Sequence, residues 1–229
     1  VDCSCEQIIL GQIPSICTAS ATFDLRPFSD PKPGTWKSNN PIVVITNGVL
    51  NLGNMPTGMY EIYYELNTAP PIPCPSDKKV IINVFNPKNA GTSRGAEYCV
   101  GATDVVSLFD RLDNEDIGGT WSVVSGGSAG FNAQTGTFNL TSRPAGTYVF
   151  RYSFTGQSPC PDDQEDVTIK INALPVADAG LDKTLNCTIQ SAILGTETTS
   201  SGNNIIYEWK LGNDIVSNQK LFTVLEGGI

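Results

Sequence analysis

Apolar and polar residues alternate along several short stretches of this chain, most regularly in 60–64, 80–84, 148–152 and 167–171. Successive side chains of a β-strand point to opposite faces, so this alternation predicts strands that bury one face and expose the other. Clusters of Gly, Pro, Asn and Ser separate the stretches, as they do in proteins built from antiparallel strands. The pattern therefore predicts an all-β chain of antiparallel β-sandwiches.

One stretch, residues 104–112, follows a helical period instead. Its apolar side chains occupy positions i, i+3, i+4 and i+7: Val105, Leu108, Phe109 and Leu112. Such spacing places side chains on one side of a helix, and we expect one or two helical turns that cover the end of a sandwich core. Pro27 disfavours a helix in the corresponding earlier part of the chain, because proline has no backbone donor.

The tryptophans mark an internal repeat, since each of them follows a cysteine at a similar distance. The pairs are Cys17 with Trp36, Cys99 with Trp121, and Cys187 with Trp209, at separations of 19, 22 and 22 residues. The cysteines give repeat periods of 82 and 88 residues. We therefore expect one small sandwich for each repeat.

Two copies of the repeat share further motifs in the same order. They are Gly34-Thr35-Trp36 and Gly119-Thr120-Trp121, then 56–60 and 144–148, then Cys74-Pro75 and Cys160-Pro161. An early tryptophan and a Gly-x-Tyr sequence that enters a late strand resemble the buried tryptophan and the tyrosine corner of immunoglobulin-like (Ig-like) domains. We expect the corresponding side chains in the cores: Trp36, Trp121, Trp209, Tyr60 and Tyr148.

The motifs divide the chain into four parts. Residues 1–16 are interpreted as the end of a preceding repeat, 17–88 and 89–174 as Ig-like repeats, and 175–229 as a truncated, more divergent repeat. The junctions between repeats are short and contain proline, which restricts bending, so tandem sandwiches arranged as an elongated rod are expected. The sequence begins without Met or a signal peptide, and we interpret it as a processed piece of a longer chain.

The cysteine positions predict disulfides within single repeats. Antibody domains place a cysteine two residues after the corner tyrosine, but here those positions hold Ile62 and Phe150. Cysteines stand instead at the start of each repeat and in its last hairpin. We therefore predict two bonds, each contributing about 4 kcal/mol in the chain-entropy model. They are Cys17–Cys74 and Cys99–Cys160.

Three cysteines have no partner in this scheme. Cys187 is homologous to Cys99, so its partner is expected beyond Ile229. Cys5 resembles the hairpin cysteine of a preceding repeat. For both Cys5 and Cys3, the sequence does not distinguish a local disulfide partner from an upstream one. A zinc site is disfavoured because the chain has no Cys-x2-Cys or Cys-x4-Cys knuckle.

Composition removes several classes of chemistry. The chain contains no histidine, which excludes His-based catalytic triads, His-ligated metals and His pH switches. A net charge of −9 with only 14 Lys and Arg residues disfavours nucleic acid and anionic membrane surfaces. No apolar run approaches the roughly 18 residues of a membrane span. We expect no enzyme, no catalytic or cofactor-binding residue and no membrane insertion.

Two short motifs still invite a chemical interpretation. Residues 126–130 match the Gly-x-Ser-x-Gly nucleophile elbow, but this motif needs a histidine base, so a flexible hairpin loop is expected. The second motif is a carboxylate cluster formed by Asp162, Asp163, Glu165 and Asp166. Oxygen ligands of this kind suit calcium, but the spacing is not that of an EF-hand. We favour a solvated turn, with calcium as the alternative.

The second repeat carries the fullest form of a recognisable pattern. It combines Gly-Gly-Thr-Trp, Ala-Gly-Thr-Tyr-x-Phe-x-Tyr, Cys-Pro-Asp-Asp and a closing Val-Thr-Ile-x-Ile within 99–171. This pattern resembles repeats of giant surface adhesins and extracellular filament proteins of gliding Bacteroidota. Residues 177–187 with 194–196 are similar to the Ig-like or PKD-like repeats of the same proteins. The resemblance implies export by type IX secretion, an oxidising environment, and a role in adhesion, gliding motility or cell capture.

The expected function is that of a non-enzymatic stalk or filament segment in a large secreted cell-surface adhesin or cell-capturing appendage. Its expected partners are neighbouring repeats of the same chain, further copies in a filament and, through other parts of the protein, a target cell surface. No cofactor is expected apart from the calcium candidate. The alternative is a carbohydrate-binding module of a secreted hydrolase, which needs exposed aromatic platforms, whereas the repeat-equivalent tryptophans predict burial.

Overall fold

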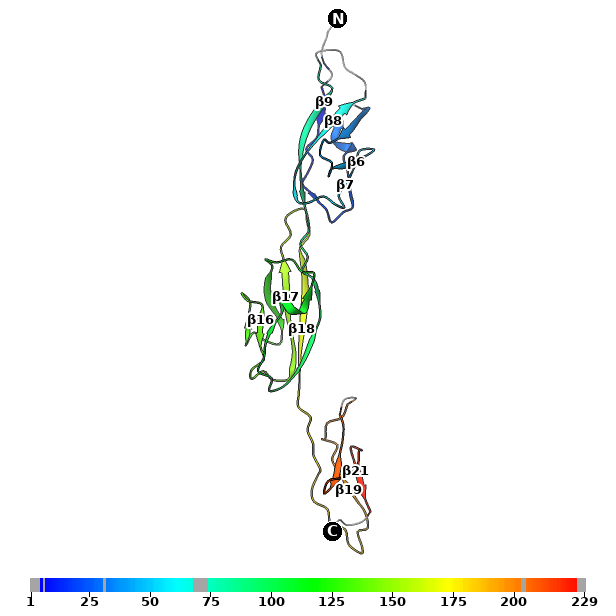
Figure 1. Cartoon of the computed structure of the whole chain (residues 1–229), viewed down its shortest axis with the longest axis vertical. Helices are drawn as coiled ribbons and strands as arrows, with labels where there is room; N and C mark the ends of the chain where they lie inside the picture. The colour runs from blue at the N-terminus through cyan, green and yellow to red at the C-terminus, as the bar shows by residue number, and fades with distance from the viewer. Residues whose placement is uncertain (1–4, 6, 31, 68–73, 203–204, 226–229) are drawn as a thin grey trace. The chain divides into compact units, whose positions relative to one another are not determined.

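The regular secondary structure of the described chain consists almost entirely of β-strands (Figure 1). The computed structural model describes residues 5, 7–30, 32–67, 74–202 and 205–225. Its helical elements in that part of the chain are two 3₁₀ turns, η1 (Arg26–Phe28) and η2 (Phe109–Arg111). Residues 1–97, 103–141 and 147–170 form one compact unit, and 98–102, 142–146 and 171–229 form a second. The prediction of an all-β sandwich protein is confirmed.

The first sandwich has a four-stranded and a three-stranded sheet. The larger sheet has the order β2 (Ile16–Cys17), β9 (Asp77–Phe85), β8 (Gly58–Leu66), β5 (Gly34–Lys37). The smaller has the order β3 (Thr22–Asp24), β7 (Val49–Asn51), β6 (Val44–Thr46). A separate pair joins β1 (Ile9–Leu10) to β4 (Ser29–Asp30). Strands β2 and β9 run parallel, whereas the other pairs of this sandwich are antiparallel.

The second sandwich repeats this arrangement strand for strand. Its larger sheet has the order β11 (Ala96–Cys99), β18 (Asp163–Asn172), β17 (Gly146–Phe154), β14 (Thr120–Ser125). The smaller has the order β12 (Val105–Ser107), β16 (Thr137–Asn139), β15 (Phe131–Asn132). The separate pair is β10 (Thr92–Ser93) with β13 (Leu112–Asp113). The sequence repeat is therefore a repeat of structure.

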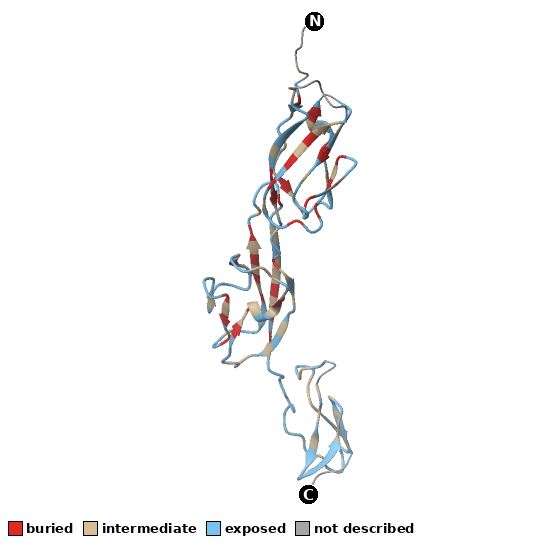
Figure 2. Cartoon of the chain, turned by 45° about the horizontal axis from the view of Figure 1, so that its top comes forward, coloured by how far each residue is buried: buried red, intermediate tan, exposed pale blue. Residues whose placement is uncertain are grey.

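The cores form where the sequence alternates. Tyr148, Phe150 and Tyr152 of β17 are all buried, while the residues between them are more exposed. Figure 2 shows the buried residues along the strands of the two sandwiches. The tryptophans of the Gly-Thr-Trp motif are also buried, with 3% of Trp36 and 6% of Trp121 exposed. Each indole packs on a tyrosine of the long central strand. The ring centroids of Trp36 and Tyr64 are 5.3 Å apart, and those of Trp121 and Tyr152 are 4.9 Å apart.

This packing explains the glycine of the Gly-Thr-Trp motif. A Cβ at Gly119 would lie 2.7 Å from the Tyr152 ring, closer than side-chain carbons approach in proteins. The Gly119 amide also donates a hydrogen bond to the Tyr152 hydroxyl at 2.9 Å. The predicted tyrosine corner is present at Tyr60, whose hydroxyl donates to the Pro56 carbonyl at 2.8 Å.

The helix predicted over 104–112 does not form. Strand β12 occupies its first half and pairs with β16, and the single 3₁₀ turn η2 follows. Leu108 and Leu112 are buried all the same, because a strand followed by a tight turn also directs them into the core. The period of a short apolar run does not by itself distinguish a helix from a strand followed by a turn. The first sandwich has a 3₁₀ turn at the same place, and Pro27 occupies its first turn.

The first sandwich begins earlier than predicted. The sequence motifs place residues 1–16 in a preceding repeat, but Ile8 is buried in the first core and β1 pairs with β4. The Lys78 ammonium also donates to the Ile8 carbonyl at 3.0 Å. The part of this segment that the structure describes, from Cys5 onward, therefore belongs to the first sandwich.

The third repeat, called the third unit below, comprises the described residues 175–202 and 205–225 and is smaller and more open. Strand β19 (Ala192–Leu194) pairs with β22 (Phe222–Val224), and β20 (Trp209–Leu211) pairs with β21 (Asp214–Ser217). None of its described residues is buried, and Trp209 is only half-buried. The prediction of Trp209 as a core residue is wrong, because its side chain lines an open groove instead of a closed core. No helix in the described part of the chain is long and apolar enough to cross a membrane.

Candidate functional site

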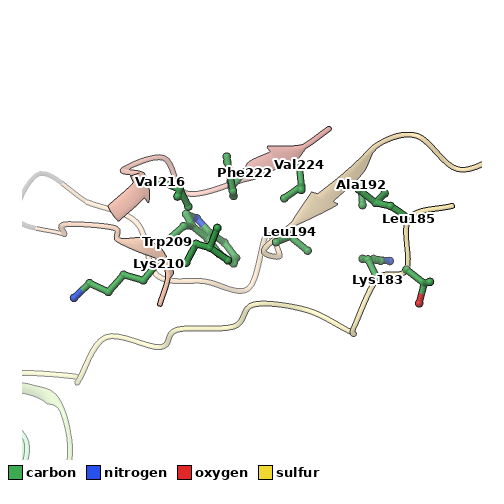
Figure 3. Close-up of a pocket in the computed structure, with 11 residues that line it drawn as sticks. Lys183, Leu185, Ala192, Leu194, Trp209, Lys210, Val216, Phe222 and Val224 are labelled. Atoms are coloured by element: carbon green, nitrogen blue, oxygen red, sulfur yellow. The ribbon is translucent and has the colours of Figure 1, made fainter. Parts of the chain in front are cut away.

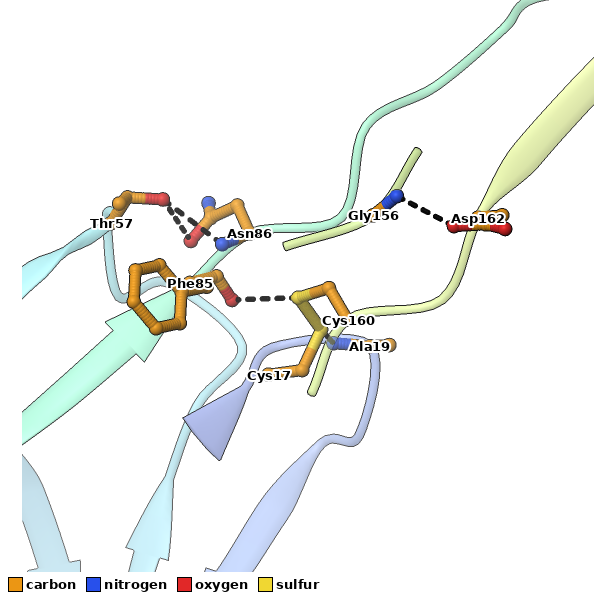
Figure 4. The surroundings of a disulfide bond; sticks show 8 residues. All are labelled: Cys17, Ala19, Thr57, Phe85, Asn86, Gly156, Cys160 and Asp162. Carbon is orange, nitrogen blue, oxygen red and sulfur yellow. Dashed lines mark hydrogen bonds between the residues drawn. A yellow bond between two sulfur atoms is a disulfide. The ribbon is translucent and has the colours of Figure 1, made fainter. Parts of the chain in front are cut away.

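The two disulfides connect different cysteines from those predicted. Cys17 bonds to Cys160 and Cys5 bonds to Cys74, over sequence separations of 143 and 69 residues. Both predicted pairs, Cys17–Cys74 and Cys99–Cys160, are wrong. The Cys17–Cys160 bond links the first sandwich to the last hairpin of the second (Figure 4).

The length of the central strands explains the error. Cys17 lies beside Phe85, the last residue of β9, whereas Cys74 precedes the first residue of that strand. The rise between Asp77 and Phe85 is about 27 Å at ~3.4 Å per residue, and a disulfide needs Cα atoms within about 7 Å. A bond between Cys17 and Cys74 is therefore geometrically impossible.

The same argument separates Cys99 from Cys160 in the second sandwich. The amide of Val100 donates to the carbonyl of Asn172, the last residue of β18, at 2.9 Å. Cys160 stands before the other end of β18, about 30 Å away along the strand. Cys99 is consequently a free, exposed thiol, as is Cys187. Cys3 lies outside the described residues.

The Cys17–Cys160 bond is enclosed by polar contacts at the junction (Figure 4). Cys160 is buried, and its sulfur lies 3.4 Å from the Phe85 carbonyl oxygen. A disulfide sulfur has no proton to donate, so this contact is one of packing. Nearby, the Asn86 amide donates to the Thr57 hydroxyl at 2.9 Å, which fixes the chain just after β9. The disulfide and the Phe85 contact hold the end of the first sandwich against the hairpin turn of the second.

The hairpin turn that presents Cys160 is itself tightly folded. The Cys160 amide donates to the Gln157 carbonyl at 2.8 Å, and the Gly156 amide donates to the Asp162 carboxylate at 2.7 Å. A Cβ on Gly156 would collide with the backbone carbonyls of Cys160 and Pro161. Glycine is therefore required at position 156, and the turn presents the sulfur in one orientation.

The four carboxylates proposed as calcium ligands each bind a different donor. Asp162 accepts from Gly156, Asp163 from the Ala90 amide at 2.7 Å, and Glu165 from the Ser93 amide at 2.8 Å. Asp163 and Glu165 thereby tie the segment that leads into the second sandwich to β18. No group of three or more His, Cys, Asp or Glu residues suited to a metal is present in the described part of the chain.

The fourth carboxylate, Asp166, forms a two-point ion pair with Arg151 on the neighbouring strand. The guanidinium donates to both carboxylate oxygens, at 2.8 and 2.9 Å. These bonds hold the pKa of the Asp166 carboxyl below its usual value. The pair thus links β17 to β18 just behind the hairpin turn.

An apolar groove of about 560 Å³ lies in the third unit (Figure 3). Side chains of all four strands of this unit line it, among them Leu194, Trp209, Val216 and Phe222. The Trp209 and Phe222 rings are 6.1 Å apart, and the indole nitrogen donates to the Gln219 carbonyl at 2.9 Å. The sequence did not predict this groove, because the repeat places Trp209 at the position of a core tryptophan.

Comparison with known proteins identifies no family for this chain. No protein-family model and no curated protein matches the chain. Among solved structures it is similar to human mucin-like protocadherin EC1-2, with 13% identity and a TM-score of 0.37 over 74% of this chain and 99% of that one. It is similar to the human desmocollin-1 ectodomain, with 9% identity and a TM-score of 0.34 over 85% of this chain and 46% of that one. It is similar to the insect immune protein hemolin, with 12% identity and a TM-score of 0.22 over 95% of this chain and 66% of that one.

Proposed function

We propose that this chain is a non-enzymatic, load-bearing spacer of an extracellular adhesion-type protein. In this function it is a stalk or filament segment that separates a binding region from its point of attachment. The observation that carries the proposal is the disulfide between Cys17 and Cys160. It adds a second covalent link between two sandwiches that the peptide chain already joins.

The bond supports a mechanical function because it redirects tension. A force applied at the two ends follows the shortest covalent path, which runs to Cys17, crosses to Cys160 and continues along β18. The residues between the two cysteines carry none of this force while the bond is intact. They include Trp36 and Trp121, so most of both packed cores lies outside the load path.

The two disulfides also support an extracellular location. Such bonds persist in oxidising compartments and are rare where thiols are kept reduced. Each closes a long loop, and the chain-entropy model gives about 4–5 kcal/mol for loops of this size. This is a large contribution beside the 5–15 kcal/mol that stabilises an ordinary domain.

Burial of Trp36 and Trp121 argues against the carbohydrate-binding alternative in the two sandwiches. A sugar platform needs the face of an exposed ring, and the rings of Trp36 and Trp121 are covered by Tyr64 and Tyr152. These side chains stabilise their own sandwiches instead.

An in-frame deletion of residues 18–99 tests the spacer function in the protein that contains this chain. The deletion removes one repeat period of 82 residues and leaves Cys5 available for Cys160, as it is for Cys74 in the intact chain. Binding to the target is expected to persist, with a reach shorter by one sandwich. The matched control replaces the deleted residues with an unrelated sandwich of similar size, which should restore the reach. Loss of binding in both variants, at equal surface amounts, would place recognition in these residues and overturn the proposal.

A further inference from the structure

The third unit contains part of the fold of the first two sandwiches. Its pair β19–β22 corresponds to β3–β7 and to β12–β16. Strand β20 carries Trp209, as β5 carries Trp36 and β14 carries Trp121. The described residues of the third unit contain no counterpart of the long hairpins β8–β9 and β17–β18.

Those hairpins cover the surface that is open in the third unit. In the second sandwich, Phe138 of β16 packs on Tyr148 and Phe150 of β17, with ring centroids 5.0 and 4.8 Å apart. Tyr152 of the same strand covers Trp121. Without such a strand, Leu194, Phe222 and Trp209 line the groove instead (Figure 3). The repeat itself therefore identifies what fits the groove, which is a β-hairpin with alternating aromatic side chains.

Cys99 is an independent indication of the same ligand. It ends β11 as Cys17 ends β2, and the next amide bonds to the end of the long strand in both sandwiches. Thr18 donates to Phe85 and Val100 donates to Asn172, each at 2.9 Å. Cys17 in this position bonds to the hairpin cysteine of the following sandwich. Cys99 in the equivalent position is an exposed thiol in the same compact unit as the groove.

We propose that the groove of the third unit binds a β-hairpin of the β17–β18 type, and that a Cys-Pro turn at the tip of this hairpin forms a disulfide with Cys99. The hairpin inserts aromatic side chains beside Leu194, Trp209 and Phe222. The bond forms by thiol–disulfide exchange with a small-molecule disulfide such as oxidised glutathione. The hairpin thiolate first displaces one glutathione thiol, and the Cys99 thiolate then attacks the hairpin sulfur and displaces the second.

The test uses the whole chain and a peptide that spans residues 144–172, which supplies β17, the turn with Cys160 and β18. The two are mixed in a glutathione redox buffer, and the adducts are mapped by digestion without reductant. Docking raises the effective concentration of the peptide thiol. The rate of adduct formation at Cys99 is expected to exceed that at Cys187 by about tenfold or more. Cys187 is the comparison because it is also free and exposed and follows Leu185 of the groove by two residues, so the preference for Cys99 reports the position of the hairpin tip.

Two pairs of single substitutions separate docking from general thiol reactivity. In the peptide, Phe150→Ser removes an inward ring, whereas Val149→Ser changes its outward neighbour. In the chain, Leu194→Ser changes the groove, whereas Ile193→Ser changes the adjacent residue, which does not line it. The first member of each pair should abolish the preference for Cys99, and the second should keep it. The peptide pair leaves the chain unaltered, so a folding defect cannot produce its result.

Two outcomes would overturn the proposal. One is equal modification of Cys99 and Cys187 by all peptides, which would show unselective reaction of exposed thiols. The other is dimerisation of the chain without peptide that Leu194→Ser prevents, which would make a second copy the occupant of the groove. The load-bearing function would survive either result, because it depends on the Cys17–Cys160 bond.

Discussion

The arrangement of the two disulfides predicts how far the chain extends when it is pulled from its ends. With both bonds intact, 12 residues connect Cys5 to Cys17, and the bond then leads directly to Cys160. Replacing Cys17 and Cys160 with Ser sends the load through the Cys5–Cys74 bond and then through the 86 residues from Cys74 to Cys160. The path lengthens by 74 residues, or about 260 Å at ~3.5 Å per residue.

Full reduction should release more chain than the double substitution. With neither bond present, the path gains the whole separation of 143 residues between Cys17 and Cys160, about 500 Å. The Cys74→Ser variant is the matched control. This variant removes the Cys5–Cys74 bond, which carries no load while Cys17–Cys160 is intact. The substitution should therefore add no length.

Single-molecule force spectroscopy with handles at the two ends of the chain measures these three contour lengths. The expected increments above the oxidised chain are zero, about 260 Å and about 500 Å for the control, the double variant and the reduced chain. If the double variant extended no further than the oxidised chain, the Cys17–Cys160 bond would not carry the load. An increment in the Cys74→Ser variant would contradict the assigned path.

Three further predictions concern the second sandwich. Gly119→Ala should cost about 1–3 kcal/mol in denaturant unfolding, because the added methyl meets the Tyr152 ring. Trp121→Ala should cost about 3–5 kcal/mol in the same assay, and the native indole should resist aqueous quenchers. Arg151 lowers the pKa of Asp166, so the ion pair stabilises the fold above the usual carboxyl value of 3.8 and its effect is lost as pH falls through the lower folded value. The stability difference between wild type and Asp166→Asn should therefore shrink on acidification, and it should be small because both side chains are about one-third exposed, at 35% and 37%.

Each of these predictions has a control or a contrary result. Gly53→Ala should be nearly neutral, since the nearest atom to its Cβ lies at an ordinary contact distance of 3.5 Å. A freely quenched indole at Trp121 would contradict its burial and favour an exposed platform. A stability difference for Asp166→Asn that stayed constant through the acid range would show that the ion pair does not couple folding to protonation.

Local patterns predicted the strands and the buried side chains for a physical reason. The alternation in 148–152 determines the register of the strand, because only one register buries Tyr148, Phe150 and Tyr152 together. The sequence repeat also predicted the burial of Trp36 and Trp121, since equivalent motifs fold alike. The helix over 104–112 failed because four apolar positions satisfy a strand followed by a turn as well as a helix. Pairing of β12 with β16, which is distant in sequence, decides between them.

The disulfide pairing could not be obtained from the repeat alone. Two equivalent pairs of cysteines are compatible with bonds inside each copy and with bonds between copies, and sequence spacing does not distinguish them. Strand length does distinguish them, but only once β2 is known to pair beside the end of β9. A short Ile-Cys strand carries no sequence signal for that parallel pairing.

The geometry of the repeat makes cysteines at these two positions suited to joining sandwiches. The hairpin cysteine stands before one end of the long strand, and the β2-type cysteine stands beside its other end. The strand separates them by about 27 Å, so neither can reach the other within one sandwich. Each must find a partner in a neighbouring segment or remain free, as Cys17 and Cys99 show. A chain that repeats this fold can therefore join consecutive sandwiches covalently through these two cysteine positions, as the Cys17–Cys160 bond does.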